Sequence, residues 1–296
     1  MRFPITQPRS LFRRKTAKDD AMAGLILGVE SVPDGLASGL LAGVNPVAGL
    51  YAYLFGVAGG ALFTSTAFMA VQGTGAMAII VADVDLAGGD DPARTLFTLS
   101  MLTGVVMIVA GLLKLGTFLR FVSTSVMTGF ITAVGVNIVL GQLDDFTGYE
   151  ADGGNRITRA LDLLLNFWKV DGPTLTVGVV TVVLIVVLQR TRLGPLGLVV
   201  AVVAGSVLAA VFSSFDRDIQ LVRDIADVPR SLPLPKLPRL GEIPALLIPA
   251  PSLACVGLVH GAGVSAGVPN EDGEAQDESQ DFDAQGAGNI VAGVFH

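Results

Sequence analysis

The sequence predicts an all-α membrane protein that crosses the bilayer several times. The chain of 296 residues is 51% hydrophobic and only 15% charged, whereas a soluble globular protein carries about a quarter charged residues. Its apolar residues gather in long runs that are separated by charged or Pro/Gly-rich loops. Runs of this kind supply the roughly 20 apolar residues that a transmembrane helix needs.

Composition also argues against several functions. The formal net charge of −7 disfavours nucleic acid as a partner. The single cysteine, Cys255, lies inside an apolar run, so neither a disulfide framework nor a thiolate metal site is expected. The two histidines are His260 and His296, too few for a histidine metal cluster, and there is no Walker loop. We therefore expect no enzyme, no metal site and no cofactor.

The N-terminal region predicts how the chain is oriented. Residues 1–19 are rich in Lys and Arg, and the apolar run behind them is too long for a signal peptide. We expect them to form a basic cytoplasmic tail of a multi-pass protein in the cell (plasma or inner) membrane, with lipid around its helices. The basic loops near residues 114–120 and 190–192 then fall inside, and the acidic loops 85–91 and 144–152 fall outside, as the positive-inside bias requires.

Seven membrane segments are expected within residues 20–212, which we interpret as one repeat. The third is half-length. The first is expected to be interrupted over residues 30–35, where Pro33 removes a backbone donor and kinks the helix. The predicted segments are 20–43, 47–63, a short helix ending near 84, 95–113, 121–143, 174–188 and 195–212. Residues 159–169 read as an amphipathic segment at the membrane interface instead of a span.

The remaining residues read as a loop and the start of a second repeat. Residues 213–242 contain four prolines in their second half and are expected to form an extracytoplasmic loop. Residues 243–296 begin the second repeat, with an eighth helix over 243–268, an acidic loop over 270–283 and a ninth segment from near Ala284. Because an odd number of segments precedes it, a second repeat would be inserted upside down, which is the inverted-repeat plan of transporters.

A glycine-punctuated polar break at Val71–Ala76 is the most informative stretch of the chain. The short apolar run 77–82 follows it. Such a break inside a membrane is costly unless its backbone groups meet protein, water or a ligand. A short helix that begins there directs free N–H groups and its positive end toward the middle of the membrane. The break therefore predicts an anion site.

Several motifs resemble the SulP (sulfate permease) family of anion transporters. Asp20–Gly24, Val32–Ala37 and Leu41–Tyr51 resemble the N-terminal signature of that family. Residues 257–263 are similar to its eighth helix, and residues 285–290 to the start of its ninth. The likeness covers nearly the whole chain, and its first block is the most specific part.

The resemblance implies an architecture and a mechanism. Members have fourteen helices in two inverted seven-helix repeats, and typically add a cytoplasmic STAS domain. A core of helices moves against a gate, and the anion sits between the half-helices of segments 3 and 10. The present sequence stops inside segment 9, so we expect a fragment or a chain that another polypeptide completes, without a STAS domain and with half an anion site. The complete unit is expected to be a homodimer.

The resemblance also assigns candidate site residues. Those expected to bind substrate are Asp34, Ser38, Gln72, Gly73, Thr74, Gly75 and Ala76. Those expected to bind the coupling ion are Glu30, Asp34 and His260. The family often has Gln where Asp34 stands, proline where Gly73 stands, and an acidic residue where His260 stands. A histidine can relay a proton near neutral pH but cannot be the anionic ligand of a sodium site.

Structural alternatives to these roles stay open. The break can be a glycine-rich packing kink, Asp34 a carboxylate in a water-filled vestibule, and His260 a packed core residue. The function expected from the resemblance is secondary active symport of an inorganic anion: sulfate first, then bicarbonate or a dicarboxylate, driven by protons or sodium. The alternatives are a uracil/xanthine-type permease, which shares the inverted-repeat plan, and a fragment or partner subunit that transports nothing alone.

Overall fold

The computed structural model describes residues 17–66, 69–84, 86, 91–121, 123–191, 193–194, 196–214, 232–265 and 277–295. Within these ranges the chain is helical, with one isolated β-bridge between Pro235 and Phe295. The predicted tail 1–19 lies largely outside the described residues. The chain forms two compact units, and their boundaries fall within helices α2 and α6. The first unit comprises Met1–Ala17, Pro33–Val134 and Val228–His296; the second comprises Lys18–Val32 and Gly135–Asp227.

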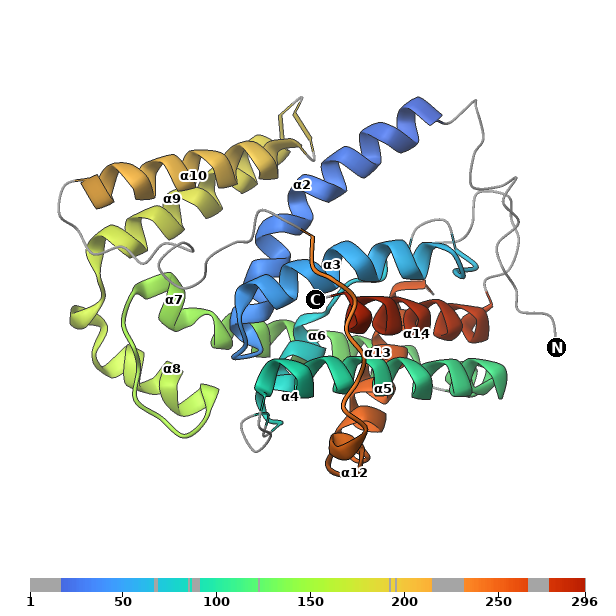
Figure 1. Ribbon diagram of the computed structural model, residues 1–296. Helices are drawn as coiled ribbons and strands as arrows, with labels where there is room; N and C mark the ends of the chain where they lie inside the picture. The colour runs from blue at the N-terminus through green and yellow to red at the C-terminus, as the bar shows by residue number, and fades with distance from the viewer. Residues whose placement is uncertain are drawn as a thin grey trace. The chain divides into compact units, whose positions relative to one another are not determined.

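The first unit is built from helices at both ends of the chain. It contains the end of α2 (Ala17–Leu41), α3 (Pro46–Ala61), α4 (Gly75–Ala82), α5 (Pro92–Leu112), η1 (Leu115–Phe121), the start of α6 (Thr124–Gly141), η3 (Leu240–Glu242), α12 (Ile243–Leu246), α13 (Pro249–Ser265) and α14 (Glu278–Val294). Helix α14 packs against both α3 and α5, although it is the last helix in the chain (Figure 1).

Glycines let α14 approach α5 closely. A Cβ atom on Gly104 would lie 2.5 Å from the carbonyl oxygen of Gly286, and one on Gly286 would lie 2.6 Å from the carbonyl oxygen of Gly104. Both contacts are too short for any side chain. Membrane helices use small residues in this way, because backbone contact replaces the hydrophobic effect that drives packing in water.

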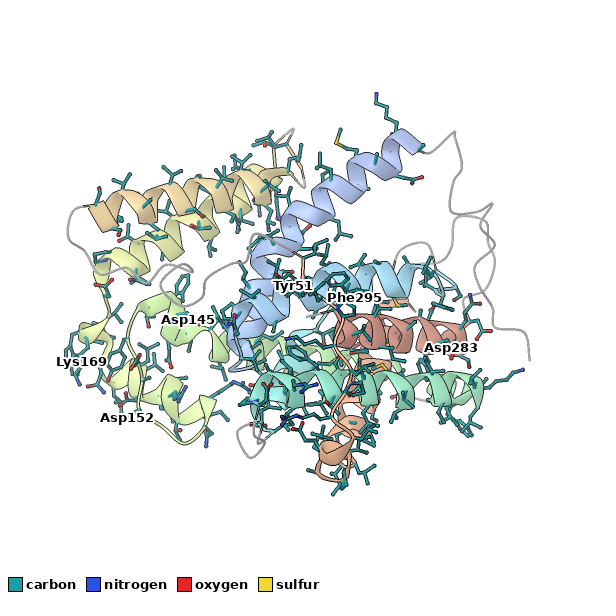
Figure 2. All side chains as sticks on the ribbon, in the orientation of Figure 1. Tyr51, Asp145, Asp152, Lys169, Asp283 and Phe295 are labelled. Carbon is teal, nitrogen blue, oxygen red and sulfur yellow. The ribbon has the colours of Figure 1, made fainter. Side chains whose placement is uncertain are left out.

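Aromatic stacking fixes the C-terminal end of α14. The Phe55 ring on α3 stacks on Phe295, with their centroids 4.9 Å apart, and the Tyr51 ring lies tilted by 51° against Phe55. Figure 2 labels Tyr51 and Phe295, which lie near one another. The backbone N–H of Lys236 donates to the carbonyl oxygen of Val294 at 2.8 Å. These contacts join α3, α14 and the segment before η3.

The second unit contains the hairpin of α9 and α10. Its elements are the first part of α2, the end of α6, α7 (Leu143–Thr147), α8 (Arg156–Leu165), η2 (Phe167–Lys169), α9 (Gly172–Gln189) and α10 (Leu196–Ser214). Helix α8 exposes a stripe formed by Ile157, Leu161 and Leu164, at the spacing of an amphipathic helix. The predicted amphipathic segment is thus a helix that starts at Arg156; its place at a membrane interface stays a prediction.

The helices before residue 214 follow the predicted order. Among the described residues, α2, α5, α9 and α10 are long and apolar enough to cross a membrane. Helix α3 and the stretch Thr128–Gly141 of α6 are shorter apolar helices, and α4 has only eight residues. The half-length third segment is therefore confirmed. The chain is a multi-pass membrane protein of all-α architecture.

The expected interruption of the first helix does not divide it into two helices, and the kink expected at Pro33 stays a prediction. Helix α2 continues from Ala17 to Leu41 with Pro33 inside it. Proline removes one backbone donor, but membrane helices tolerate this because neighbouring groups satisfy the freed carbonyl. The glycines beyond Pro33 have a different role. A Cβ on Gly39 would lie 2.7 Å from the Cα of Pro46, so α2 and α3 meet there in backbone contact.

The predicted eighth helix is wrong as a single element. The chain forms two helical pieces, Leu240–Leu246 and Pro249–Gly263, which are bent by 67° relative to one another. Pro249 has no N–H and disfavours the helical conformation at Ile248, so the first piece ends there. The two pieces can be one broken span.

The acidic loop expected over 270–283 ends earlier than predicted. Helix α14 begins at Glu278, and the Asp277 side chain caps it by accepting from the N–H groups of Ser279 and Gln280. Asp281 is buried, and its Oδ1 accepts from the Ser65 N–H at 2.9 Å, the Ser65 hydroxyl at 2.9 Å and the Thr64 hydroxyl at 3.1 Å. Contacts from a distant loop thus hold acidic residues inside the helix.

Candidate functional site

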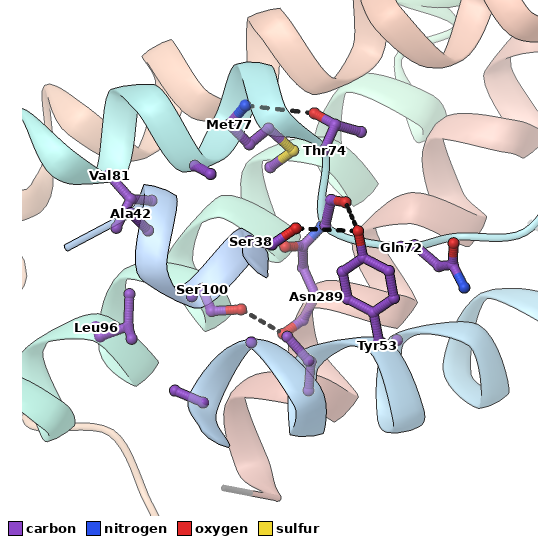
Figure 3. Close-up of a pocket in the computed structure, with 18 of the residues that line it drawn as sticks. Ser38, Ala42, Tyr53, Gln72, Thr74, Met77, Val81, Leu96, Ser100 and Asn289 are labelled. Carbon is purple, nitrogen blue, oxygen red and sulfur yellow. Dashed lines mark hydrogen bonds between the residues drawn. The ribbon is translucent and has the colours of Figure 1, made fainter. Parts of the chain in front are cut away.

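A cavity of about 160 Å³ lies within the first unit (Figure 3). Residues of α2, α3, α5, α13 and α14 line it, together with the break before α4 and one face of α4 itself. Its polar lining residues are Ser38, Tyr53, Gln72, Thr74, Ser100, Thr103 and Asn289, and none of its lining residues is charged. Pockets for drug-sized ligands usually exceed about 300 Å³, so this cavity suits a small ion better than an organic molecule.

The start of α4 borders this cavity. Thr74 has extended backbone angles, and its Oγ1 accepts from the N–H of Met77 at 3.3 Å. The Thr74 carbonyl accepts from Ala78 N–H at 2.9 Å. A helix start leaves its first N–H groups without acceptors in the helix, and here these belong to Gly75 and Ala76. Because the Thr74 oxygen acts as an acceptor in the cap, its hydroxyl proton stays available for a ligand.

Tyr53 on α3 forms hydrogen bonds with the break before α4 and with helix α2. Its hydroxyl donates to the carbonyl oxygen of Gly73 at 2.8 Å, and it lies 3.1 Å from the Ser38 hydroxyl. A tyrosine has one hydroxyl proton and a carbonyl can only accept, so Ser38 is the donor to Tyr53 in this arrangement. The Ser38 proton is therefore already used, and Ser38 presents only acceptor lone pairs to a ligand.

The close contact of Tyr53 explains a glycine in the break. A Cβ on Gly73 would lie 3.3 Å from the Cε2 atom of Tyr53, which is tighter than nearly all real Cβ contacts. Glycine thus lets the ring lie against the break while its hydroxyl reaches the Gly73 carbonyl. This packing gives a physical reason for glycine at position 73.

The α5–α14 wall of the cavity contains a second set of polar groups. The Ser100 hydroxyl donates to the carbonyl oxygen of Asn289 at 2.9 Å. The Asn289 Nδ2 atom donates to the carbonyl oxygen of Gln285 at 2.9 Å and contacts the Met107 sulfur at 3.4 Å. A thioether is a weak acceptor, so one amide N–H is poorly satisfied. The cavity therefore has donors on this wall as well as at the α4 start.

The structure brings some of the predicted substrate residues together. Ser38, Gln72, Gly73 and Thr74 all line the cavity. Gly75 and Ala76 form the first turn of α4 but are not lining residues. Sequence reasoning missed Tyr53, Ser100, Thr103 and Asn289; the last of these lies in the motif 285–290, where its amide was a signal available from the sequence.

The predicted coupling-ion residues lie elsewhere. Asp34 is on an exposed face of α2, His260 is half-buried in α13, and neither lines the cavity. The Nδ1 atom of His260 is buried and has no hydrogen-bond partner among the described residues. Glu30 belongs to the second unit. The coupling roles of these three residues stay predictions, and no group of three potential metal ligands occurs in the described part of the chain.

The sequence matches a protein family and several of its members. The sequence profile described as "Sulfate permease family" matches residues 18–296. "Probable sulfate transporter MT1781" of Mycobacterium tuberculosis is 27% identical over 291 residues, which cover 96% of this chain and 51% of that protein. The chain thus spans about half the length of the curated relatives that it matches.

Two solved structures share the fold. The transmembrane domain of a cyanobacterial bicarbonate transporter, BicA, superimposes with a TM-score of 0.73 at 23% identity, covering 96% of this chain and 74% of that one. The structure of SLC26A9 superimposes with a TM-score of 0.79 at 21% identity, covering 99% of this chain and 50% of that one. The all-α transporter fold predicted from the sequence is confirmed.

Proposed function

The chain belongs to the sulfate permease family, and we propose on that basis that it forms the first half of the pathway of a secondary active transporter for inorganic anions. Sulfate is the first candidate and bicarbonate the second. One observation carries the proposal: the start of α4 opens beside a small cavity that has hydrogen-bond donors but no charged lining residue. This is a site for an anion that must be released as readily as it is bound.

The α4 start supplies attraction without a full countercharge. The aligned peptide dipoles are equivalent to about half a positive charge at a helix N-terminus. The N–H groups of Gly75 and Ala76 point back along the helix axis, toward the break, and the Thr74 hydroxyl adds a third donor. An arginine or lysine in the cavity would hold an anion more strongly. Transport needs binding that is weak enough to permit exit, so the uncharged lining suits a pathway.

Alternating access is the proposed mechanism. In the family plan, a core moves against a gate, and the substrate lies between half-helices of two inverted repeats. The division of the chain supports this proposal, because α3, α4, α5, α13 and α14 belong to the first unit, whereas α9 and α10 belong to the second. We propose that residues 20–212 form the first repeat, that residues 243–296 begin the second, and that the opposing half-helix completes the site.

Coupling is proposed to involve a carboxylate of α2. Asp34 or Glu30 would bind the co-transported proton or cation, and His260 would relay a proton. The test is the pH dependence of sulfate uptake by an Asp34→Asn variant. A flattened pH profile supports the role, and an unchanged profile contradicts it. The proposal further holds that the complete protein is a homodimer in the cell membrane with a cytoplasmic N-terminus.

Uptake by proteoliposomes tests the function itself. The protein would be reconstituted into lipid vesicles. Uptake of radiolabelled sulfate and bicarbonate would then be measured under proton and sodium gradients. We expect sulfate uptake that bicarbonate inhibits and that uracil and xanthine leave unchanged. Inhibition by a nucleobase would favour the permease alternative. Uptake by a full-length relative but none by this protein would favour a subunit that transports nothing alone.

A further inference from the structure

Thr103 differs from most other hydroxyl residues of the helices. Helical Thr and Ser side chains in this chain commonly donate to the carbonyl four residues earlier. Those that do so among the described residues include Thr95, Thr98, Thr132, Thr147, Thr176, Thr181, Ser206 and Ser252. Thr103 is 1% exposed, and its hydroxyl has no hydrogen-bond partner among the described residues. It is therefore a buried donor that no described residue accepts from.

The position of this hydroxyl points to a ligand. A buried polar group without a partner destabilises a fold, and native proteins satisfy nearly all such groups. The carbonyl of Leu99, one turn earlier on α5, is the partner that other helical threonines would choose, but Thr103 does not use it. Thr103 instead lines the cavity beside the α4 start. A ligand in that cavity can accept its proton.

Asn289 lies beside Thr103 on the neighbouring helix. Ser100, Thr103 and Met107 share one face of α5 at helical spacing. Ser100 donates to the Asn289 carbonyl, and the Met107 sulfur contacts the Asn289 side-chain amide. Thr103 therefore lies on α5 between two residues that contact Asn289. Both Thr103 and Asn289 line the cavity. Their donors therefore come from α5 and α14, independently of those at α4.

We propose that Thr103 and Asn289 form a second donor set that contacts the bound anion directly. The Thr103 hydroxyl donates to one oxygen of an inorganic oxyanion, and the Asn289 amide exchanges its weak contact with the Met107 sulfur for a hydrogen bond to the same ion. The inference rests on the proposed anion transport and assigns it a specificity-determining residue outside the α4 break. An oxyanion suits the site because its several oxygens can accept from α4 and from α5 together.

The test compares anion affinity with stability in the purified protein. Sodium sulfate and, separately, sodium bicarbonate would be titrated by calorimetry into the wild type, Thr103→Val and Thr103→Ser, and melting measured without added anion. Valine has the shape of threonine but no hydroxyl. We expect Thr103→Val to bind sulfate about tenfold to hundredfold more weakly, the range for one hydrogen bond to a charged group. Its melting temperature without anion should be equal or higher, because it removes an unsatisfied hydroxyl.

Two controls keep the result decisive. Thr103→Ser retains the hydroxyl and should bind within a few-fold of the wild type. Thr95→Val removes the hydroxyl of another buried threonine of the same helix, outside the cavity, and should leave affinity unchanged. Wild-type affinity in Thr103→Val overturns the inference and leaves the proposed function standing. If the wild type binds neither anion, the proposed function itself fails. If Thr103→Val melts far below the wild type, its hydroxyl is structural and the inference fails.

Discussion

The start of α4 and the start of α5 differ in their cap residues and in how many backbone N–H groups remain without an acceptor in the helix. At α5, the Asp91 side chain accepts from the N–H of Arg94, and Pro92 occupies the first turn, where it removes one N–H donor. Helix α9 begins in the same way, with Asp171 as the cap and Pro173 behind it. At α4, the cap is the neutral Thr74, and Gly75 and Ala76 keep their N–H groups.

This difference agrees with the proposed anion site at the start of α4. A capping carboxylate offsets the positive end of a helix, and proline removes a donor that would otherwise need a partner. The chain uses both devices at α5 and α9. It uses neither at α4, where the helix start borders the cavity. At the proposed anion site, the neutral cap and the missing proline thus leave N–H groups that α5 and α9 do not offer.

Giving α4 the cap of α5 should have the largest effect. Thr74→Asp keeps a good N-cap but places a carboxylate beside the proposed anion. Two like charges near 4 Å repel by about 4 kcal/mol at an intermediate dielectric constant, so we expect sulfate affinity to fall by at least ~100-fold. The melting temperature should change little. Isothermal titration calorimetry measures the affinity.

Two control variants change the N-cap residues of α4 and α5 without adding a negative charge beside the cavity. Thr74→Ser should keep wild-type affinity, because it retains the hydroxyl. Asp91→Thr gives α5 the cap of α4 and should cost at most ~1 kcal/mol of stability without altering affinity. Undiminished sulfate affinity in Thr74→Asp would contradict the comparison between the two helix starts.

Giving α4 the proline of α5 should have a smaller effect. Gly75→Pro removes a single N–H at the first helical position, where proline is tolerated, and the extended ψ of Thr74 (150°) suits a residue before proline. We expect sulfate binding to weaken about tenfold. Gly75→Ala retains the N–H and controls for the added side chain. Equal affinities in the two variants would show that this N–H does not reach the anion.

Removing the hydrogen bond that holds the break at Gly73 should have a modest effect on stability and on sulfate affinity. Tyr53→Phe removes the hydroxyl that donates to the Gly73 carbonyl, so stability should fall by about 0.5–1.5 kcal/mol and sulfate affinity by only a few-fold. Amide hydrogen exchange over residues 69–74 should accelerate. Ser38→Ala removes only the second of the two bonds and should change exchange less. If Tyr53→Phe leaves exchange over the break unchanged, Tyr53 does not position it.

The acidic cluster of the second unit should not affect the anion at all. Asp162 accepts hydrogen bonds from the Asp152 N–H and the Tyr149 hydroxyl, both at 3.0 Å, and from the Asn166 amide at 2.9 Å. The pKa of Asp162 is lowered from its ordinary value of 3.8, first by the bond from the Asp152 backbone. Its stabilising effect is therefore complete above about pH 4 and is lost as pH falls through the lower folded pKa.

Hydrogen exchange tests this expectation. The Asp152 amide should be protected to the same degree at pH 5 and pH 7 and lose protection below pH 4. In Asp162→Asn the protection should be weaker and independent of pH. Sulfate affinity should be unchanged in this variant. A change in affinity would mean that the second unit contributes to anion binding.

Much of the fold could be predicted because its signals are local. Apolar runs predicted the spans, and the break at Val71–Ala76 predicted a short third helix. The start of α14 was misjudged because acidic residues usually mark a loop. Asp281 lies buried in α14, where Thr64 and Ser65, far away in the sequence, donate hydrogen bonds to it. The residues next to Asp281 in the sequence do not indicate that contact.

The candidate site was predictable to a smaller extent. Ser38 and Gln72–Thr74 were identified from the break and from the family motifs. Tyr53, Thr103 and Asn289 were not, because only the packing of α3, α5 and α14 decides which face of each helix meets the cavity. The role of Ser38 also depends on packing, since Tyr53 takes its proton.

Anomalous scattering from a bound selenate ion is the most direct test of the proposed site. Selenate has the shape and charge of sulfate, and its selenium can be located in crystals of the protein that carries these residues. The ion should lie at the start of α4, within hydrogen-bond distance of the Gly75 and Ala76 N–H groups and of the Thr103 hydroxyl. An ordered selenate bound elsewhere in the transport pathway, with the start of α4 unoccupied, would contradict the account.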